Sequence, residues 1–150
     1  MWVTRKVNRE PQGSQGSGCS NMQGLFRSSN GRRLTLRDTA NPILIPCYDL
    51  CSGSPFLFAE ASAKHTQNYN FIMWEVCHAT MCSPGFEMPI PVKSVDGQTT
   101  IVGIDWGFVM NNPTAVAITH VLNNKVDFAS VNGVYDIMVL SLGAGAIDCP

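Results

Sequence analysis

The stretch from Thr99 to Thr114, TTIVGIDWGFVMNNPT, constrains the fold more than any other part of the chain. An apolar, β-branched run ends at Asp105, a tight turn containing Gly107 follows, and Asn112 with Pro113 then opens an apolar helix. This order of strand, acid, turn and helix is typical of an open α/β sheet, in which ligands bind beyond the carboxyl ends of the strands. Asp105 is therefore a candidate catalytic group. The alternative is a purely structural turn, because an aspartate before a glycine also caps backbone N–H groups.

The size and charge of the chain indicate one domain with a basic leader. Its 150 residues, 45% of them hydrophobic, suffice for an ordinary core. Residues 1–37 carry seven basic residues and one acidic residue, a net charge of +6, whereas the remainder carries −7. The basic residues are scattered among glycine, serine, glutamine and asparagine. We therefore predict a flexible basic Gly/Ser-rich leader over 1–31, a domain over 32–150, and no nucleic-acid partner.

Targeting signals are sparse. No run of 18 apolar residues occurs, so no transmembrane helix is predicted, and the residues after Met1 lack the apolar segment of a secretory signal. We expect an intracellular protein, cytoplasmic or peripherally membrane-associated. A plastid location stays open because the leader, like a transit peptide, is basic and poor in acids.

Six cysteines raise the question of disulfides and metals. Without a secretory signal the expected compartment is reducing, which disfavours a disulfide framework. The spacings Cys47-x3-Cys51 and Cys77-x4-Cys82 differ from the C-x2-C spacing of common structural zinc sites. We predict no metal site and no cofactor site, with a zinc-stapled binding module as the alternative.

The other elements follow from hydrophobic period and turn residues. Apolar runs around Pro and Gly predict strands over 43–48 and 55–59 that pair as a hairpin, followed by a polar loop over 60–69. Asn70 is predicted to cap a buried helix over 71–81, and Asp96-Gly97 predicts a second hairpin before the strand that delivers Asp105. After the helix that Pro113 opens, which we expect to pack against a sheet, the run 137–142 has the composition of a buried parallel strand. The alternation of strands and helices predicts the α/β class.

A catalytic aspartate needs a nucleophile to activate, and the chain offers none by motif. No serine lies in a Gly-x-Ser-x-Gly elbow. The three histidines, His65, His78 and His120, are spread over a loop and two helices and are better explained as surface or core residues than as a cluster. Taken alone, the sequence therefore supplies a candidate base but no nucleophile for it to activate.

Several separated blocks nevertheless resemble one family. They are LTLRDTANPILIPCYDL (34–50), PFLF (55–58), FIMWEVCHAT (71–80), SVDGQT (94–99), DWGFVMNNPTAVAITHVLNNK (105–125) and VNGVYDIMVLSLG (131–143). Together they resemble the C-terminal half of a plant patatin-like lipid acyl hydrolase. The resemblance implies a three-layer α/β/α sandwich with a mostly parallel sheet, of which the chain would form a part. It also implies hydrolysis of acyl esters in phospholipids and galactolipids by a Ser–Asp dyad, with peripheral membrane contact and no cofactor.

By this resemblance Asp105 is the general base of the dyad, in an Asp-x-Gly turn completed by Trp106 and Gly107. Trp106 replaces a glycine of the family turn, so its indole either obstructs the cleft or tips outward onto a lipid-facing rim. The serine elbow and the glycine-rich oxyanion loop belong to the half of the family domain that this chain does not match. We therefore expect a fragment that carries the aspartate without the serine and that has no esterase activity alone. The alternative is an inactive lipid- or partner-binding fragment, and the oligomeric state is left open.

Overall fold

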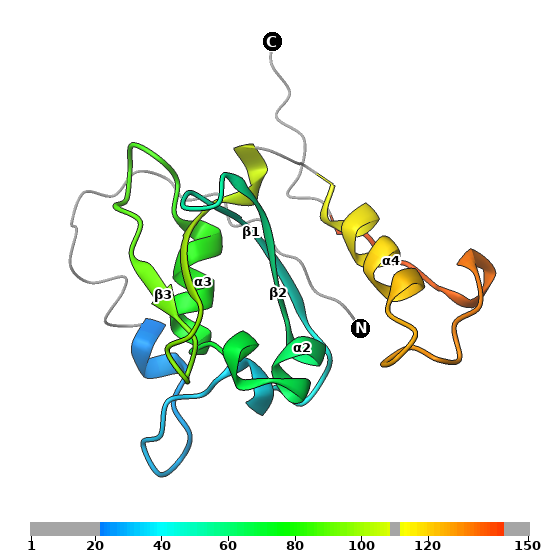
Figure 1. The fold of residues 1–150 in the computed structure, drawn as a ribbon, viewed down its shortest axis with the longest axis horizontal. Coiled ribbons are helices and arrows are strands. Elements are labelled where there is room, and N and C mark those ends of the chain that lie inside the picture. Colours follow the sequence, from blue (N-terminus) through cyan, green and yellow to red (C-terminus); the bar gives the residue numbers. More distant parts are fainter. Residues whose placement is uncertain (1–21, 109–111, 143–150) are drawn as a thin grey trace. The chain divides into compact units, whose positions relative to one another are not determined.

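The computed structural model describes residues 22–108 and 112–142, which fall into two units divided between Asn111 and Asn112. Among the described residues, the first unit contains the hairpins β1–β2 and β3–β4 with the helices α2 and α3, and the second contains the helix α4 (Figure 1). In chain order the elements of the first unit are η1 (Leu36–Asp38), β1 (Leu44–Asp49), β2 (Ser54–Ala59), α2 (Glu60–His65), η2 (Gln67–Tyr69), α3 (Met73–Met81), β3 (Pro91–Lys93), β4 (Thr100–Ile104) and η3 (Trp106–Phe108). The second unit contains α4 (Pro113–Asn123) and η4 (Val134–Asp136).

The strands of the first unit form one sheet in the order β2-β1-β4-β3. β1 pairs with β2 from Leu44 opposite Ala59 to Asp49 opposite Ser54. The turn between the two strands contains Gly53, which has a φ of +63°. β3 pairs with β4 across a second turn, in which Gly97 has a φ of +73°. Glycine adopts this left-handed conformation without the penalty of a Cβ atom. Both predicted hairpins are therefore confirmed.

The sheet contradicts the prediction of a mostly parallel arrangement. Every strand pair within the described residues is antiparallel, including β1 with β4, where Tyr48 lies opposite Ile104. The tight turns explain this direction for β1 with β2 and for β3 with β4, because a turn of a few residues reverses the chain, whereas parallel neighbours need a crossover of a dozen residues or more. The α/β class is confirmed, but a three-layer sandwich is not seen in the part of the chain that the structure describes.

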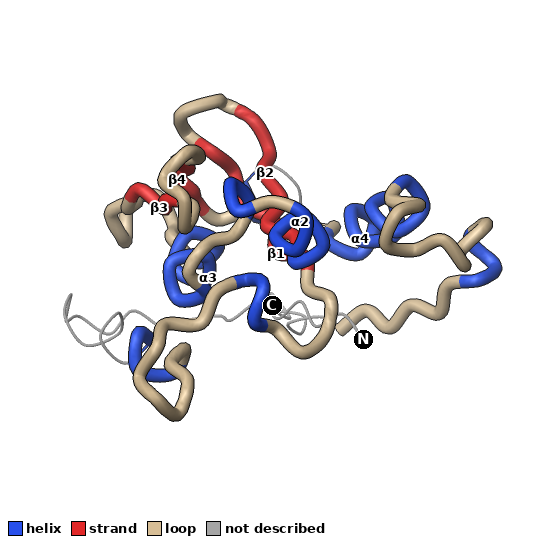
Figure 2. Tube along the Cα trace, turned by 60° about the horizontal axis from the view of Figure 1, so that its bottom comes forward, coloured by secondary structure: helices blue, strands red, loops and turns tan. Residues whose placement is uncertain are grey.

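The core lies between the sheet and α3, which contacts β1 and β4 on one face (Figures 1 and 2). Phe58 and Phe71 meet edge to face in this core, with ring centroids 5.0 Å apart. The helix approaches the sheet closely at Gly103, where a Cβ atom would lie 2.8 Å from the Cβ of Ala79. The buried core residues are Leu36, Cys47, Phe58, Ala63, Phe71, Met73, Val76, Ala79, Val92 and Ile101.

Helix α2 occupies residues that were predicted to form a loop. Glu60, Ala61 and Ala63 turn inward along it, and Lys64 forms an i,i+4 ion pair with Glu60. The good helix formers in this segment and the ion pair favour a helix. The segment is so polar that its sequence shows no clear apolar period. The predicted helix over 71–81 is confirmed as α3, except that its N-cap is Ile72 and not Asn70.

Asn70 has a different role from the predicted cap. Its Oδ1 accepts a hydrogen bond of 3.2 Å from the backbone N–H of Arg37. The two residues between Asn70 and α3 form isolated bridges, Phe71 with Ser94 and Ile72 with Thr35. This pairing keeps them extended, which is why the helix begins two residues later than predicted.

In the second unit, α4 begins as predicted. Pro113 opens it, and the Asn112 side chain accepts a hydrogen bond of 3.0 Å from the backbone N–H of Ala115. Val121 is its one fully buried residue. The expected packing of this helix against a sheet stays a prediction. The prediction of a buried strand over 137–142 is wrong for this structure. Met138 is 98% exposed, and no strand occurs among residues 112–142.

The described part of the predicted leader is ordered into short elements. Residues 22–25 form a helical turn, and Arg27 pairs with Arg33 in an antiparallel bridge. Residues 1–21 lie outside the described part, and the boundary at residue 31 stays a prediction. Among the described residues no helix is both long and apolar enough to cross a bilayer.

Candidate functional site

Asp105 lies at the end of β4, where the sheet meets the C-terminal end of α3. Its backbone N–H donates a hydrogen bond of 2.8 Å to the carbonyl of Cys82, the residue that caps α3. Two residues earlier, Gly103 contacts Ala79 of the same helix. The position of Asp105 is therefore set by a strand on one side and by a helix on the other.

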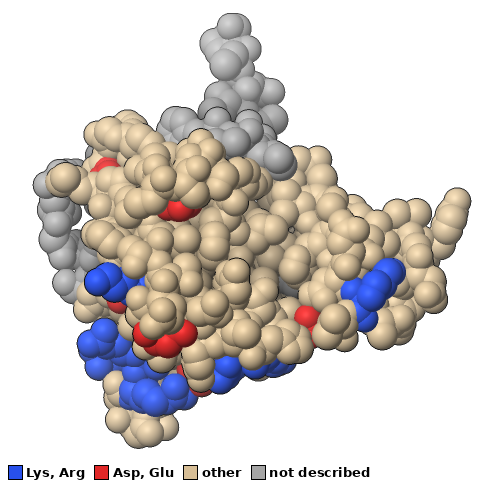
Figure 3. Space-filling view, viewed as in Figure 1, with Lys and Arg blue, Asp and Glu red and all other residues tan. Residues whose placement is uncertain are grey.

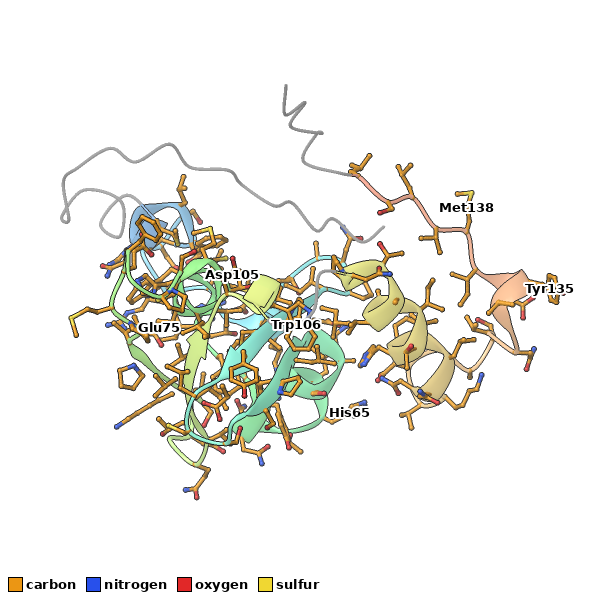
Figure 4. All side chains as sticks on the ribbon, turned by 90° about the horizontal axis from the view of Figure 1, so that it is seen from above. His65, Glu75, Asp105, Trp106, Tyr135 and Met138 are labelled. Carbon is orange, nitrogen blue, oxygen red and sulfur yellow. The ribbon has the colours of Figure 1, made fainter. Side chains whose placement is uncertain are left out.

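The carboxylate of Asp105 closes a tight turn. Its Oδ1 accepts a hydrogen bond of 2.9 Å from the backbone N–H of Gly107, and the residue is half-buried (Figure 4). This contact is the capping role that was the structural alternative in the sequence. Within the described residues, Oδ2 accepts no hydrogen bond. One oxygen is thus held by the turn while the other is left to interact with a further group.

Trp106 follows Asp105 and is only 6% exposed. The indole therefore does not tip outward onto an exposed rim, which was one of the two sequence alternatives. Its Nε1–H group is buried and has no hydrogen-bond partner among the described residues. A buried donor left unpaired costs about 1–3 kcal/mol.

A second buried acid, Asp49, was not singled out in the sequence. It is 4% exposed, and its two carboxylate oxygens accept hydrogen bonds from the backbone N–H groups of Cys51, Ser52 and Val102, at 3.0 to 3.1 Å. Burial by itself raises the pKa of Asp49, but the hydrogen bonds from Ser52, Val102 and Cys51 outweigh it and lower the pKa. Asp49 therefore ties the β1–β2 turn to β4, three residues before Asp105. The only sequence signal was an aspartate at the end of a strand before a turn.

The histidines do not assist Asp105. Within the described residues no histidine hydrogen bonds to its carboxylate. His78 is buried on α3 with an unpartnered Nδ1, and His120 is half-buried on α4 in edge contact with Phe128. The part of the chain that the structure describes also holds no group of three or more histidine, cysteine or acidic residues able to bind a metal ion.

Comparison with known proteins gives consistent matches. The chain is 51% identical over 124 residues to "Probable inactive patatin-like protein 9" of Arabidopsis thaliana and 56% identical over 114 residues to "Patatin-like protein 6" of the same plant. It is 41% identical over 145 residues to "Patatin-like protein 3" of Oryza sativa subsp. indica. These matches cover 83%, 76% and 96% of this chain but only 32%, 23% and 35% of those proteins. The chain thus spans about a third or less of the length of these relatives. No protein-family model matches it.

Proposed function

This chain is a stretch of plant patatin-like sequence, and we propose that it supplies the general base of a lipid acyl hydrolase. The base is Asp105, and the substrate is an acyl ester of a membrane lipid. The observation that carries the proposal is the state of the carboxylate. Oδ1 is fixed by the N–H of Gly107, and Oδ2 accepts no hydrogen bond from the described residues.

This geometry suits proton transfer. A general base must lie within hydrogen-bond reach of the proton that it accepts and must keep a fixed orientation. The turn bond to Gly107 and the backbone bond to Cys82 restrict the orientation of Asp105, so that Oδ2 is the oxygen available to a serine hydroxyl. Because no serine of this chain stands in a Gly-x-Ser-x-Gly elbow, the proposal places the nucleophile outside these 150 residues.

The proposed reaction has two steps. The serine oxygen attacks the ester carbonyl carbon while its proton moves to Oδ2 of Asp105, and backbone N–H groups elsewhere stabilise the oxyanion. The leaving alcohol, a lysolipid or glycolipid, takes that proton, and an acyl-serine remains. A water molecule then attacks the acyl group and passes its proton to the same carboxylate, which returns it to the serine.

For the whole patatin-like domain, we propose the three-layer sandwich that the family resemblance implies. The rice relative of 41% identity matches 96% of this chain, and the matched part is 35% of the rice protein.

A second candidate function is an inactive domain that binds lipid or a partner. Trp106 favours it, because a buried indole occupies the residue next to the proposed base. One relative of 51% identity also carries the words "Probable inactive" in its name. The two candidates differ in one measurable property, which is ester turnover in an intact patatin-like domain.

The test uses a patatin-like host protein that hydrolyses p-nitrophenyl esters, in which this chain replaces the matching segment. We expect Asp105→Asn to lower turnover by at least about 100-fold, the usual contribution of a general base. Asparagine keeps the oxygen that accepts the Gly107 N–H, so the turn should survive. Asp96→Asn is the matched control, because Asp96 also caps a turn, through Ser94 and Gln98, but lies in the β3–β4 hairpin.

The results separate the candidates. An active chimera that loses turnover with Asp105→Asn but not with Asp96→Asn supports the general-base proposal. An inactive chimera that gains turnover with Trp106→Gly supports the inactive candidate instead. The 150-residue chain alone should show no turnover above background. If the chain alone did hydrolyse esters in an Asp105-dependent way, the placement of the nucleophile outside it would be wrong.

A further inference from the structure

A hollow on the first unit lies between the segment before η1 and the start of α3. Its volume is about 160 Å³, whereas one water molecule needs only about 10–15 Å³. It is lined by Gln23, Arg27, Arg33 and Trp74, and we call it the arginine hollow. Asp105 is not part of its lining, so the hollow is separate from the proposed catalytic group.

The two arginines are forced together by the backbone. Arg27 and Arg33 are directly opposite each other in an antiparallel bridge. The flanking backbone bonds run from the N–H of Leu34 to the carbonyl of Phe26 and from the N–H of Ser28 to the carbonyl of Arg32. This pattern makes Arg27 and Arg33 a non-hydrogen-bonded pair, the kind in which opposite side chains lie closest and on the same face.

Like charges in such a pair destabilise the strands unless something offsets them. The neighbouring Arg32 is already neutralised, because its two guanidinium nitrogens hydrogen bond both oxygens of Asp38 at 2.8 and 3.0 Å. Among the described residues, the Arg27 side chain donates to the carbonyl of Gly31, at 3.1 Å. Arg33 forms no ion pair within the described residues. Figure 3 shows several of the Lys and Arg side chains together at the lower left of the view.

One acid partly offsets this charge. The charge of Arg33 acts to lower the pKa of Glu75 on α3, although burial outweighs it and no ion pair links the two side chains. Within the described residues Arg27 forms no ion pair, and the effect of Glu75 falls on Arg33. The arginine hollow therefore keeps a surplus positive charge at a place with room for a further anion.

We propose that the arginine hollow binds a phosphate group, and that the source is a phospholipid headgroup. Arginine presents a planar fork of donors that matches phosphate oxygens, and the Gln23 amide adds a further donor. Trp74, which is half-buried on α3, adds an apolar wall with a polar N–H. Tryptophan has this character at the boundary between lipid and water, which is why we favour a headgroup over a soluble phosphate ester.

The experiment uses the whole 150-residue chain and measures co-sedimentation with phosphatidylcholine vesicles that contain or lack phosphatidic acid. Arg33→Gln should lower the affinity for the anionic vesicles about fivefold, the usual contribution of one basic residue at such a surface. Lys93→Gln is the matched control, because it removes one exposed positive charge from β3. It should change the affinity by less than twofold. Glu75→Gln should raise the affinity, since it removes the competing carboxylate.

Two further measurements identify the ligand. Arg33→Lys keeps the charge but loses the fork, and we expect it to bind more weakly than the unsubstituted chain. Glycerol 3-phosphate should compete with the vesicles and should raise the melting temperature of the chain, but not that of Arg33→Gln. Arg33→Gln removes the repulsion between the two arginines and so should not weaken the fold. The melting temperature of this variant without ligand therefore shows whether it is folded.

Other outcomes would overturn the proposal. Equal losses for Arg33→Gln and Lys93→Gln would show a diffuse charge effect. A rise in melting temperature with glycerol 3-phosphate, in a chain that does not bind the vesicles, would overturn the headgroup source. Tighter binding to RNA than to vesicles would overturn the lipid assignment. None of these measurements involves Asp105, so failure here leaves the proposed function untouched.

Discussion

Replacing Gly103 by alanine tests how the sheet and α3 hold the candidate base. A Cβ atom at this position would lie 2.8 Å from the Cβ of Ala79 and 3.3 Å from the Sγ of Cys47. Carbon atoms in contact prefer separations of about 3.5–4.0 Å, so β4 and α3 must move apart by roughly an ångström. Overpacking of this kind costs about 1–3 kcal/mol, and the reduced freedom of the unfolded chain returns about 0.4–1 kcal/mol. We expect a net loss of about 1–2 kcal/mol in the free energy of unfolding.

Urea denaturation measures this loss, with two comparison variants. Gly24→Ala makes the same chemical change in open space and should not destabilise the chain. Ala79→Gly removes the atom that Gly103→Ala would meet, so the double variant should be more stable than the sum of the single effects predicts. Additive effects, or an unchanged stability in Gly103→Ala, would refute the close-contact argument. In the chimera described above, Gly103→Ala should also lower turnover, because Asp105 follows two residues later.

Two predictions concern other ionisable groups. Burial raises the pKa of Cys47 to about 12, so alkylation of the native chain followed by peptide mass spectrometry should modify the exposed Cys51 first and Cys47 only on unfolding. The Arg32 hydrogen bond lowers the pKa of Asp38 from 3.8 to about 2, so the stability from this pair is complete above pH 3.8 and lost as the pH falls through about 2. Arg32 is 56% exposed, so water screens this pair, and acid titrations should show a small loss of stability below pH 3.8 in the unsubstituted chain that is absent in Arg32→Gln.

Elements with a strong local signal were predictable from the sequence. The turn glycines at positions 53 and 97 both adopt positive φ and close the two predicted hairpins. Asn112 with Pro113 starts a helix for the physical reason given in the sequence, a side-chain cap followed by a residue without a backbone N–H. Such features depend on a few neighbouring residues, so no knowledge of the tertiary fold was needed to find them.

Features that depend on distant partners were not predictable in the same way. Asn70 has the residue type of a helix cap, but a bridge from Ile72 to Thr35 keeps the intervening backbone extended. Asp49 is buried and bonded to Val102, 53 residues away along the chain, which no local pattern indicates. At the candidate site the sequence located Asp105 and its turn, whereas the burial of Trp106 required the structure.

The run 137–142 shows most clearly how composition and structure answer different questions. Apolar composition predicts burial, and a strand additionally needs neighbours that pair with its N–H and C=O groups. The described second unit provides neither burial nor a pairing strand for this run. Leu140 is 71% exposed, and no strand occurs within 112–142. An exposed apolar run of this kind is prone to association, because its apolar surface is left in contact with water. Composition alone therefore could not predict whether 137–142 forms a strand, since backbone pairing depends on neighbours that a local pattern does not show.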